Sequence, residues 1–434
     1  MADRPTLNGH RRVAIVSGIR TPFVKAGTVF SGLTALDLGR MVVQELVQRA
    51  DIDPQEIDQV VFGQVIPTIT ATSIAREVLI AAGLPRTIEA YTVARACATS
   101  IQALTDAANT ISLGLADVAI VGGTESMSDV PVFASRPLAQ ALVAASKGKD
   151  LPGKLRPFQK LKPKDLLPTP PAIAEYSTGM TMGESAEKMA KENGISRKEQ
   201  DEIALASHRN AARAWSEGKF KDEVMHVLIP PAFEQVAERD NIVRQDSTLE
   251  ALAELRPVFD KKYGTVTAGN SSPLTDGAAA LVVMSEEKAR SLGYEPLGFL
   301  RAYAYAATDP ADQLLQGPAY AAPVALERAG MTLQDVDLFE MHEAFAAQVA
   351  SNLQAFASEE FARKAGRSTP LGEVDHSRLN LTGGSIALGH PFAATGARVV
   401  LQALHELKQR GKSTAMCTVC AAGGLGVAVI LERA

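Results

Sequence analysis

Three residues of this sequence are of types that can carry covalent and proton-transfer chemistry: Cys97, His390 and Cys420. Cys97 begins a predicted amphipathic helix, and backbone N–H groups at a helix start can stabilise a thiolate. That position suits a nucleophile. The alternative for a single cysteine is a small buried hydrophobic residue, and a single histidine is more often structural.

His390 and Cys420 both adjoin glycine-rich segments. His390 ends the run GGSIALGH (383–390), and Cys420 is followed by AAGGLG. Small residues let backbone N–H groups approach a ligand closely, as an oxyanion site requires. We therefore expect close contact with a substrate at both places, with Ala422 and Gly423 among the binding residues.

Cys417 and Cys420 have the spacing C-x-x-C, which can bind zinc or carry redox chemistry. No second cysteine pair follows, and the nearby His405 lies upstream in a predicted helix. A structural zinc ion takes four protein ligands, so we expect no metal here and place Cys417 in the core.

The chain contains an internal repeat, because residues 49–64 and 328–343 align at one offset of 279. The identical pairs are Arg49/Arg328, Ala50/Ala329, Gln55/Gln334 and Asp58/Asp337. Downstream of both copies the predicted order is strand, loop, helix, strand, and His390 takes the position in the second copy that Cys97 takes in the first. This agreement indicates duplication.

Strands that alternate with helices predict an α/β fold with largely parallel sheets covered on both faces. Two such units would stack as layers α/β/α/β/α, with the site at strand carboxyl ends where the halves meet. Dense prolines and intervening helices predict an inserted lid. We expect an N-terminal half at 1–128 plus 248–297, a lid at 129–247 and a C-terminal half at 298–434.

Composition narrows the function classes. The 434 residues are 46% hydrophobic and 21% charged, with net charge −5 and three cysteines. These values predict a globular protein of two or three domains, without affinity for nucleic acid and without a disulfide framework. The chain shows neither an apolar signal stretch nor a membrane-spanning run, so we expect a cytoplasmic protein, or one of the mitochondrial matrix in a eukaryote.

Several motifs together resemble the thiolase family over nearly the whole chain. They are Arg20–Phe23 (RTPF), Cys97, Gly122–Ser128 (GGTESMS), Gly264–Asn270 (GTVTAGN), His342–Phe345 (HEAF), Gly383–Pro391 and Cys420–Gly426. The resemblance implies a duplicated thiolase fold and a 3-ketoacyl-CoA thiolase that cleaves its substrate with free CoA, as in the last step of fatty-acid β-oxidation. CoA would be a substrate, and no metal or redox cofactor is implied.

The resemblance also implies roles for individual residues. Cys97 would be the acylated nucleophile, His390 its base and an oxyanion donor, and Cys420 the acid and base at the acetyl-CoA methyl group. The backbone N–H groups of Cys97 and Ala422 would hold a second oxyanion, and Ala422 replaces a glycine common in the family. Ser272 would lie beside the pantetheine chain.

Two further residues carry alternatives. His342 stands where many thiolases have asparagine to hold a catalytic water, and histidine there is similar to the β subunits of fatty-acid oxidation trifunctional complexes. This implies a homodimer within a heterotetramer, with an α subunit that carries hydratase and dehydrogenase activities. Arg244 would lie near the adenine of CoA, or it is a solvated surface charge.

Residues 147–164 hold seven basic side chains and one acidic one, a local excess of six in an acidic chain. Leu151, Leu155, Phe158 and Leu161 lie among them. A solvated loop is one interpretation. The other is a docking surface for the α subunit or an anionic membrane, near the entrance for the acyl chain.

Three rival functions remain. A biosynthetic acetoacetyl-CoA thiolase would use the same residues in reverse. A ketoacyl synthase is disfavoured, because it has a second histidine where Cys420 stands. A catalytically inactive lipid-binding or scaffolding relative is disfavoured by the joint presence of Cys97, His390 and Cys420.

Overall fold

Helices and strands alternate along the computed structural model, which describes residues 11–169 and 174–434. The strands are β1 (Val13–Arg20), β2 (Val24–Lys25), β3 (Gln59–Gly63), β4 (Glu89–Val93), β5 (Val118–Glu125), β6 (Val227–Leu228), β7 (Val236–Ala237), β8 (Thr275–Ser285), β9 (Gly298–Ala307), β10 (Leu338–Met341), β11 (Thr414–Ala421) and β12 (Leu425–Arg433). The helices are α1 (Ala35–Ala50), α2 (Ile74–Ala81), α3 (Thr99–Ser112), α4 (Arg136–Ser146), α5 (Leu151–Leu155), α6 (Met182–Glu192), α7 (Arg197–Ser216), α8 (Leu249–Ala253), α9 (Glu286–Ser291), α10 (Gly317–Ala329), α11 (Ala346–Ala357), α12 (Glu359–Lys364), α13 (Ser385–Leu388) and α14 (Thr395–Arg410).

The main sheet is mixed and has the strand order β10-β11-β12-β9-β1-β8-β5-β3-β4. Only β10–β11, β3–β4 and β3–β5 are parallel pairs along this order, and the other five are antiparallel. The expectation of largely parallel sheets is therefore wrong. A tight turn at 422–424 joins β11 to β12, and so short a connection can link only antiparallel neighbours.

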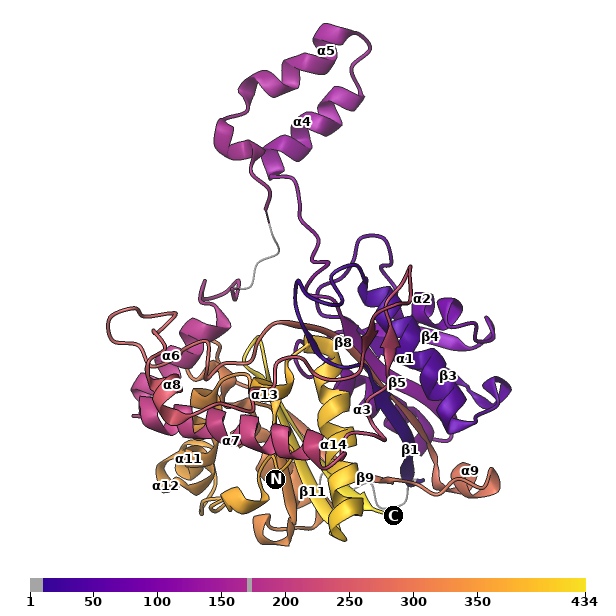
Figure 1. Cartoon of the computed structure of the whole chain (residues 1–434), viewed down its shortest axis with the longest axis vertical. Helices are drawn as coiled ribbons and strands as arrows, with labels where there is room; N and C mark the ends of the chain where they lie inside the picture. The colour runs from indigo at the N-terminus through magenta and orange to yellow at the C-terminus, as the bar shows by residue number, and fades with distance from the viewer. Residues whose placement is uncertain (1–10, 170–173) are drawn as a thin grey trace.

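The expected α/β/α/β/α layering is confirmed (Figure 1). Leu104 of α3 and Leu401 of α14 share one core with Val121 of β5 and Val429 of β12, so these two helices form the middle layer. Helices α1 and α2 cover the outer face of the β3–β5–β8 region. Helices α10 and α11 cover the outer face of the β9–β12 region. The site is therefore built where two halves share their central helices.

The internal repeat is also visible in hydrogen bonding. Each copy runs from a long helix through one 3-10 turn into a buried strand, α1 to β3 and α10 to β10. Asp58 accepts hydrogen bonds of 2.7 and 3.0 Å from the N–H groups of residues 117 and 118, where β5 begins. Asp337 accepts bonds of 2.8 and 3.1 Å from residues 413 and 414, where β11 begins. The matched aspartates therefore make equivalent hydrogen bonds in the two halves.

The expected lid has two differently placed parts. Helices α4 and α5 stand well away from the layered body, whereas α6 and α7 lie against it (Figure 1). The buried Arg20 of β1 anchors the later part, because it pairs with Glu223 at 3.0 Å and with Asp240 at 2.7 Å. The domain boundaries themselves stay a prediction. Within the described ranges, no helix is long and apolar enough to cross a bilayer.

Candidate active site

Cys97 lies two residues before α3, at a sharp turn that follows β4. Ala96 has φ of 43°, a left-handed conformation that is unfavourable for a residue with a side chain. Thr99 stabilises the turn, since its hydroxyl accepts a hydrogen bond from Arg95 N–H at 2.8 Å and donates one to Ala96 O at 2.7 Å. Strain of this kind concentrates at functional sites. The sequence carried no signal for the strained residue.

His390 Nε2 lies 3.1 Å from Cys97 Sγ, although 293 residues separate the two. Its other nitrogen, Nδ1, lies 2.6 Å from the hydroxyl of Thr395, the first residue of α14. Gly389 has φ of 102°, and a Cβ there would lie 2.7 Å from Thr275 Cγ2, so this turn requires glycine. Thr395 was missed from the sequence, where a hydroxyl residue at the helix start was the available signal.

Burial sets the charge of this pair. Burial, and then the positive charge of Arg398, lower the pKa of His390 to about 3, so the ring is neutral near pH 7. Burial raises the pKa of Cys97 to about 12, although the nearby backbone N–H groups of Ala422 and Cys97 act to lower it. The resting pair is thus a thiol beside a neutral imidazole. The thiolate expected from the helix start needs His390 to take the proton.

Glu125 is a second residue that sequence reasoning did not single out. Its buried carboxylate, at the end of β5, accepts from the N–H groups of Val65 at 3.0 Å and Ile66 at 3.1 Å. Burial raises the pKa of Glu125 to about 7. Its negative charge raises the pKa of Cys97 further, which favours the thiol in the resting state.

His342 and Cys420 lie at the carboxyl ends of the adjacent parallel strands β10 and β11, as the sequence predicted for site residues. The ring of His342 is buried, with its centroid 4.2 Å from that of His390. Cys97 Sγ and one nitrogen from each histidine all lie within 4.8 Å of one another. Burial is the main cause that raises the pKa of Cys420 well above its usual range.

Cys417 lies in the core, three residues before Cys420 on β11. Side chains an odd number of residues apart point to opposite faces of a strand. Cys417 accordingly packs in the middle layer, where its thiol contacts Val399 O at 3.8 Å, while Cys420 packs in a different cluster. The two sulfurs of the C-x-x-C pair therefore do not converge on one ligand.

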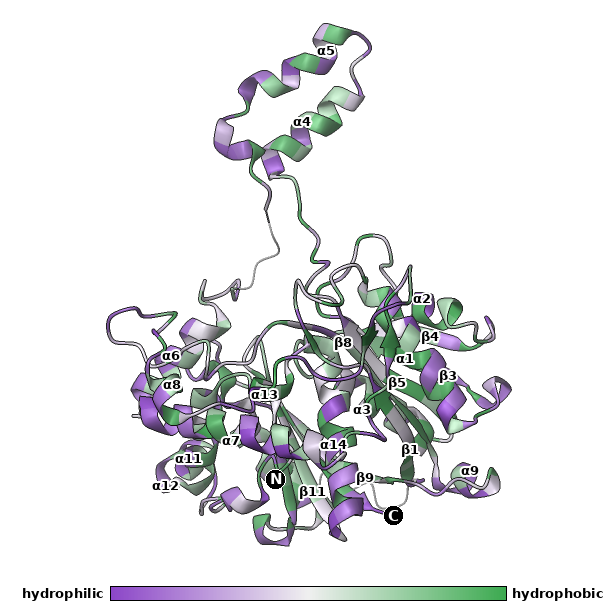
Figure 2. Ribbon diagram, in the orientation of Figure 1, coloured by the Kyte–Doolittle hydropathy of each residue, from purple (hydrophilic) through white to green (hydrophobic). Residues whose placement is uncertain are grey.

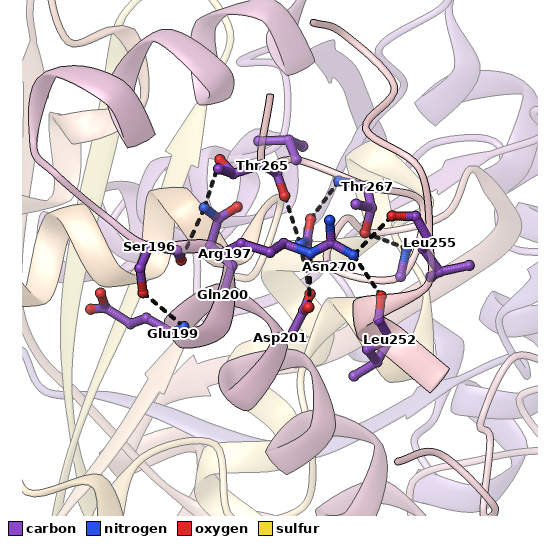
Figure 3. A network of polar contacts seen from close by, with 12 residues as sticks. Ser196, Arg197, Glu199, Gln200, Asp201, Leu252, Leu255, Thr265, Thr267 and Asn270 are labelled. Carbon is purple, nitrogen blue, oxygen red and sulfur yellow. Dashed lines mark hydrogen bonds and ion pairs between the residues drawn. The ribbon is translucent and has the colours of Figure 1, made fainter. Parts of the chain in front are cut away.

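Ser272 is held beside the His342 segment, since its N–H donates to Ala344 O at 2.9 Å. The preceding loop is fixed by the buried Asn270 (Figure 3). Its amide donates to Asp201 at 3.0 Å and accepts from Thr267 N–H at 2.8 Å. Loop residues whose backbone is fixed in this way can present Ser272 in one position.

The other two expected binding residues in this region, Arg244 and Gly423, have different surroundings from Ser272. The side chain of Arg244 is exposed, and the backbone N–H of Arg244 donates to His208 Nδ1 at 3.3 Å. Burial, and then the charge of Arg244, lower the pKa of His208 to about 4. The N–H of Gly423 donates to the carboxylate of Glu175 at 2.6 Å, so a substrate would have to displace Glu175 to use it.

Comparison with known proteins places this architecture in one family. The model of the thiolase N-terminal domain matches residues 13–287, and that of the thiolase C-terminal domain matches residues 294–433. A 3-ketoacyl-CoA thiolase of Shewanella sp. (strain W3-18-1) is 52% identical over 435 residues and 100% of both chains. One of Yersinia enterocolitica is 54% identical over 422 residues and 97% of both chains.

Solved structures of similar proteins support the same family. A Bacillus anthracis acetyl-CoA acetyltransferase superposes with a TM-score of 0.84 at 34% identity, covering 98% of this chain and 100% of the other. Human mitochondrial 3-ketoacyl-CoA thiolase superposes with a TM-score of 0.82 at 30% identity, covering 99% and 100%. With both domain models matched and relatives of this identity over the full length, the chain belongs to the thiolase family.

Proposed function

We propose that the protein is an acetyl-CoA C-acyltransferase that cleaves 3-ketoacyl-CoA with CoA, yielding acetyl-CoA and a shortened acyl-CoA. The observation that carries this proposal is the 3.1 Å contact between His390 Nε2 and Cys97 Sγ. A base at that distance can take the thiol proton as the sulfur attacks. The names of the Shewanella and Yersinia relatives support the same reaction.

In the first half-reaction, His390 takes the proton of Cys97 and the sulfur attacks the 3-keto carbon. The bond between the second and third carbons breaks, which leaves an acyl thioester on Cys97 and the enolate of acetyl-CoA. Cys420 donates its proton to that enolate. In this proposal His342 and His390 are the donors that stabilise the negative carbonyl oxygen, directly or through a water held by His342.

In the second half-reaction, the Cys420 thiolate takes a proton from CoA, whose sulfur then attacks the acyl thioester. The N–H groups of Cys97 and Ala422, which act to lower the pKa of the Cys97 thiol, would hold the oxygen of this second tetrahedral intermediate. Collapse releases the shortened acyl-CoA, and His390 returns its proton to Cys97. CoA is a substrate, with contacts proposed at Ser272, Arg244 and Gly423, and the steps require no metal or redox cofactor.

A biosynthetic acetyl-CoA C-acetyltransferase is the second candidate, because the same proton transfers run in reverse and the Bacillus anthracis neighbour carries that activity in its name. Initial rates of thiolysis on 3-ketoacyl-CoA chains from C4 to C16 test the proposal. We expect cleavage of chains longer than C4. Activity confined to acetoacetyl-CoA would favour the biosynthetic enzyme, and no thiolysis at any length would contradict both.

For assembly, we propose a cytoplasmic homodimer within a heterotetramer that includes an α subunit with hydratase and dehydrogenase activities. The hairpin of α4 and α5 (residues 135–166) would dock that subunit or an anionic membrane. Figure 2 shows hydrophobic and hydrophilic residues interleaved along it. Leu142, Val143, Leu151 and Leu155 are at least half exposed there, beside the seven basic residues of 147–164.

Charge reversal of Lys154, Arg156, Lys160 and Lys162 to glutamate is expected to weaken binding to the α subunit or to anionic vesicles, and added salt should weaken the wild type in the same way. Short-chain thiolysis should be unchanged, since α4 and α5 stand away from the layered body (Figure 1). Co-sedimentation with vesicles and with α subunit measures both associations. Reversal of the exposed Lys198, Lys221, Lys261 and Lys408 is the matched control. If both associations survive the hairpin reversal, the hairpin is a solvated loop.

A further inference from the structure

Two buried residues outside the proposed catalytic set contact one another behind His342. Arg398 is 1% exposed and Ser385 is fully buried. Arg398 Nη2 lies 2.6 Å from Ser385 Oγ, and Ser385 Oγ lies 2.8 Å from His342 Nδ1. The three residues come from α14, α13 and the end of β10, so this series of hydrogen bonds joins three separate elements of the fold.

The direction of these hydrogen bonds follows from the donor inventory. A guanidinium has only donors, so Arg398 donates and Ser385 Oγ accepts. Arg398 and His342 are the hydrogen-bond partners of Ser385 Oγ among the described residues. If Oγ also accepted from His342, its own buried proton would lack an acceptor, which is costly. The hydroxyl therefore donates to Nδ1, and Nδ1 is the unprotonated nitrogen.

The remaining nitrogen of His342 is then the donor of the ring. Burial, with the adjacent His390 ring and the charge of Arg398, holds the pKa of His342 well below its usual range, so the neutral ring carries one proton. With Nδ1 unprotonated, that proton sits on Nε2. Nε2 is buried and has no hydrogen-bond partner within the described part of the chain, and the ring lies against His390.

We infer that Arg398 and Ser385 are positioning residues that hold His342 in the Nε2–H tautomer, so that an unpaired N–H donor faces the oxygen that becomes negative when Cys97 attacks. This rests on the proposed thiolysis. The opposite tautomer would turn a lone pair toward that oxygen and repel it, whereas a fixed donor costs no reorganisation during the reaction. A hydrogen bond to one ring nitrogen commonly fixes which nitrogen of a histidine carries the proton.

The tautomer of His342 can be determined by NMR without any catalytic reaction. Nitrogen chemical shifts of ¹⁵N-histidine-labelled protein, with His342 assigned by its disappearance in His342→Gln, report which ring nitrogen is protonated. We expect Nε2–H in the wild type and in Ser385→Thr, which keeps the hydroxyl. A mixture or Nδ1–H is expected in Ser385→Ala. Nδ1–H in the wild type overturns the inference, whatever the enzyme catalyses.

A double-mutant comparison tests whether Ser385 acts through His342. Loss of one oxyanion donor typically lowers kcat by about 10²–10³-fold, so loss of its orientation in Ser385→Ala should lower kcat by about tenfold or more, with little change in KM. Glutamine has no tautomer and can place an amide donor near the position of Nε2. Ser385→Ala should therefore cost less than about twofold in a His342→Gln background.

Equal losses in the wild-type and His342→Gln backgrounds would show a merely structural role for Ser385 and overturn the inference. So would full activity of Ser385→Ala with the wild-type tautomer retained. Thermal melts of each variant identify any that fail to fold, and the wild-type spectrum and Ser385→Thr then still decide the tautomer. A wild type with the expected tautomer and no thiolysis would refute the proposed reaction and leave the hydrogen-bond assignment standing.

Discussion

Cys97→Ala is expected to lower kcat for thiolysis by about 10⁴-fold or more, because removal of a covalent nucleophile abolishes the route rather than one of its stabilising contacts. The loss should appear in kcat and not in CoA binding, since no CoA contact is proposed for this side chain. Stopped-flow or steady-state assays on a 3-ketoacyl-CoA measure it, with a thermal melt to show that the fold is retained.

The same residue should become acylated when the enzyme meets acyl-CoA without free CoA, because the two half-reactions are separable. Intact mass followed by peptide mapping should find one acyl group, on Cys97, that added CoA removes. Cys417→Ala is the matched control, since Cys417 packs in the core, and it should label as the wild type does. Acyl groups found on Cys417 or Cys420 would refute the assignment of the nucleophile.

Cys420→Ser is expected to lower thiolysis by about 10²–10⁴-fold, the usual contribution of a general acid and base. A hydroxyl is far less acidic than a thiol, so serine cannot supply and retake the proton at the enolate. Acylation of Cys97 by a preformed acyl-CoA should continue, because a CoA thiolate can leave without a proton from Cys420, whereas the enolate carbon must gain one. Mass spectrometry of acylation and NMR of acetyl-CoA methyl exchange in D₂O separate the two effects.

The methyl exchange is the more decisive of these measurements. Cys417→Ser provides the control for a serine on the same strand, and it should retain exchange if the variant folds. Exchange at the wild-type rate in Cys420→Ser would remove Cys420 from the mechanism. Loss of both exchange and acylation would indicate that the substitution had disturbed Cys97 as well.

Much of this protein could be predicted from its sequence, because the relevant signals are local. The repeat at 49–64 and 328–343 predicted two equivalent units, and Asp58 and Asp337 have equivalent hydrogen bonds in the structure. The layered α/β fold followed from alternating elements and is confirmed by the family and its solved structures. Glycine-rich runs beside His390 and Cys420 marked the segments that approach a substrate.

Strand direction could not be predicted in the same way. Alternation of helices and strands predicted parallel pairs, but β8 pairs antiparallel with both β1 and β5. The partners of β8 lie more than a hundred residues away in the chain, and their pairing depends on which edges remain free once the two halves have packed. Local periodicity carries no information about that choice.

Protonation was likewise decided by tertiary structure. From the sequence, Cys97 at a helix start suggested a thiolate, whereas burial and Glu125 favour a thiol and burial keeps His390 neutral. The chain of Arg398, Ser385 and His342 gave no sequence signal, because its members interact across separate elements. Residue types and their order are properties of the sequence, but dielectric surroundings and hydrogen-bond direction exist only once distant segments enclose the site.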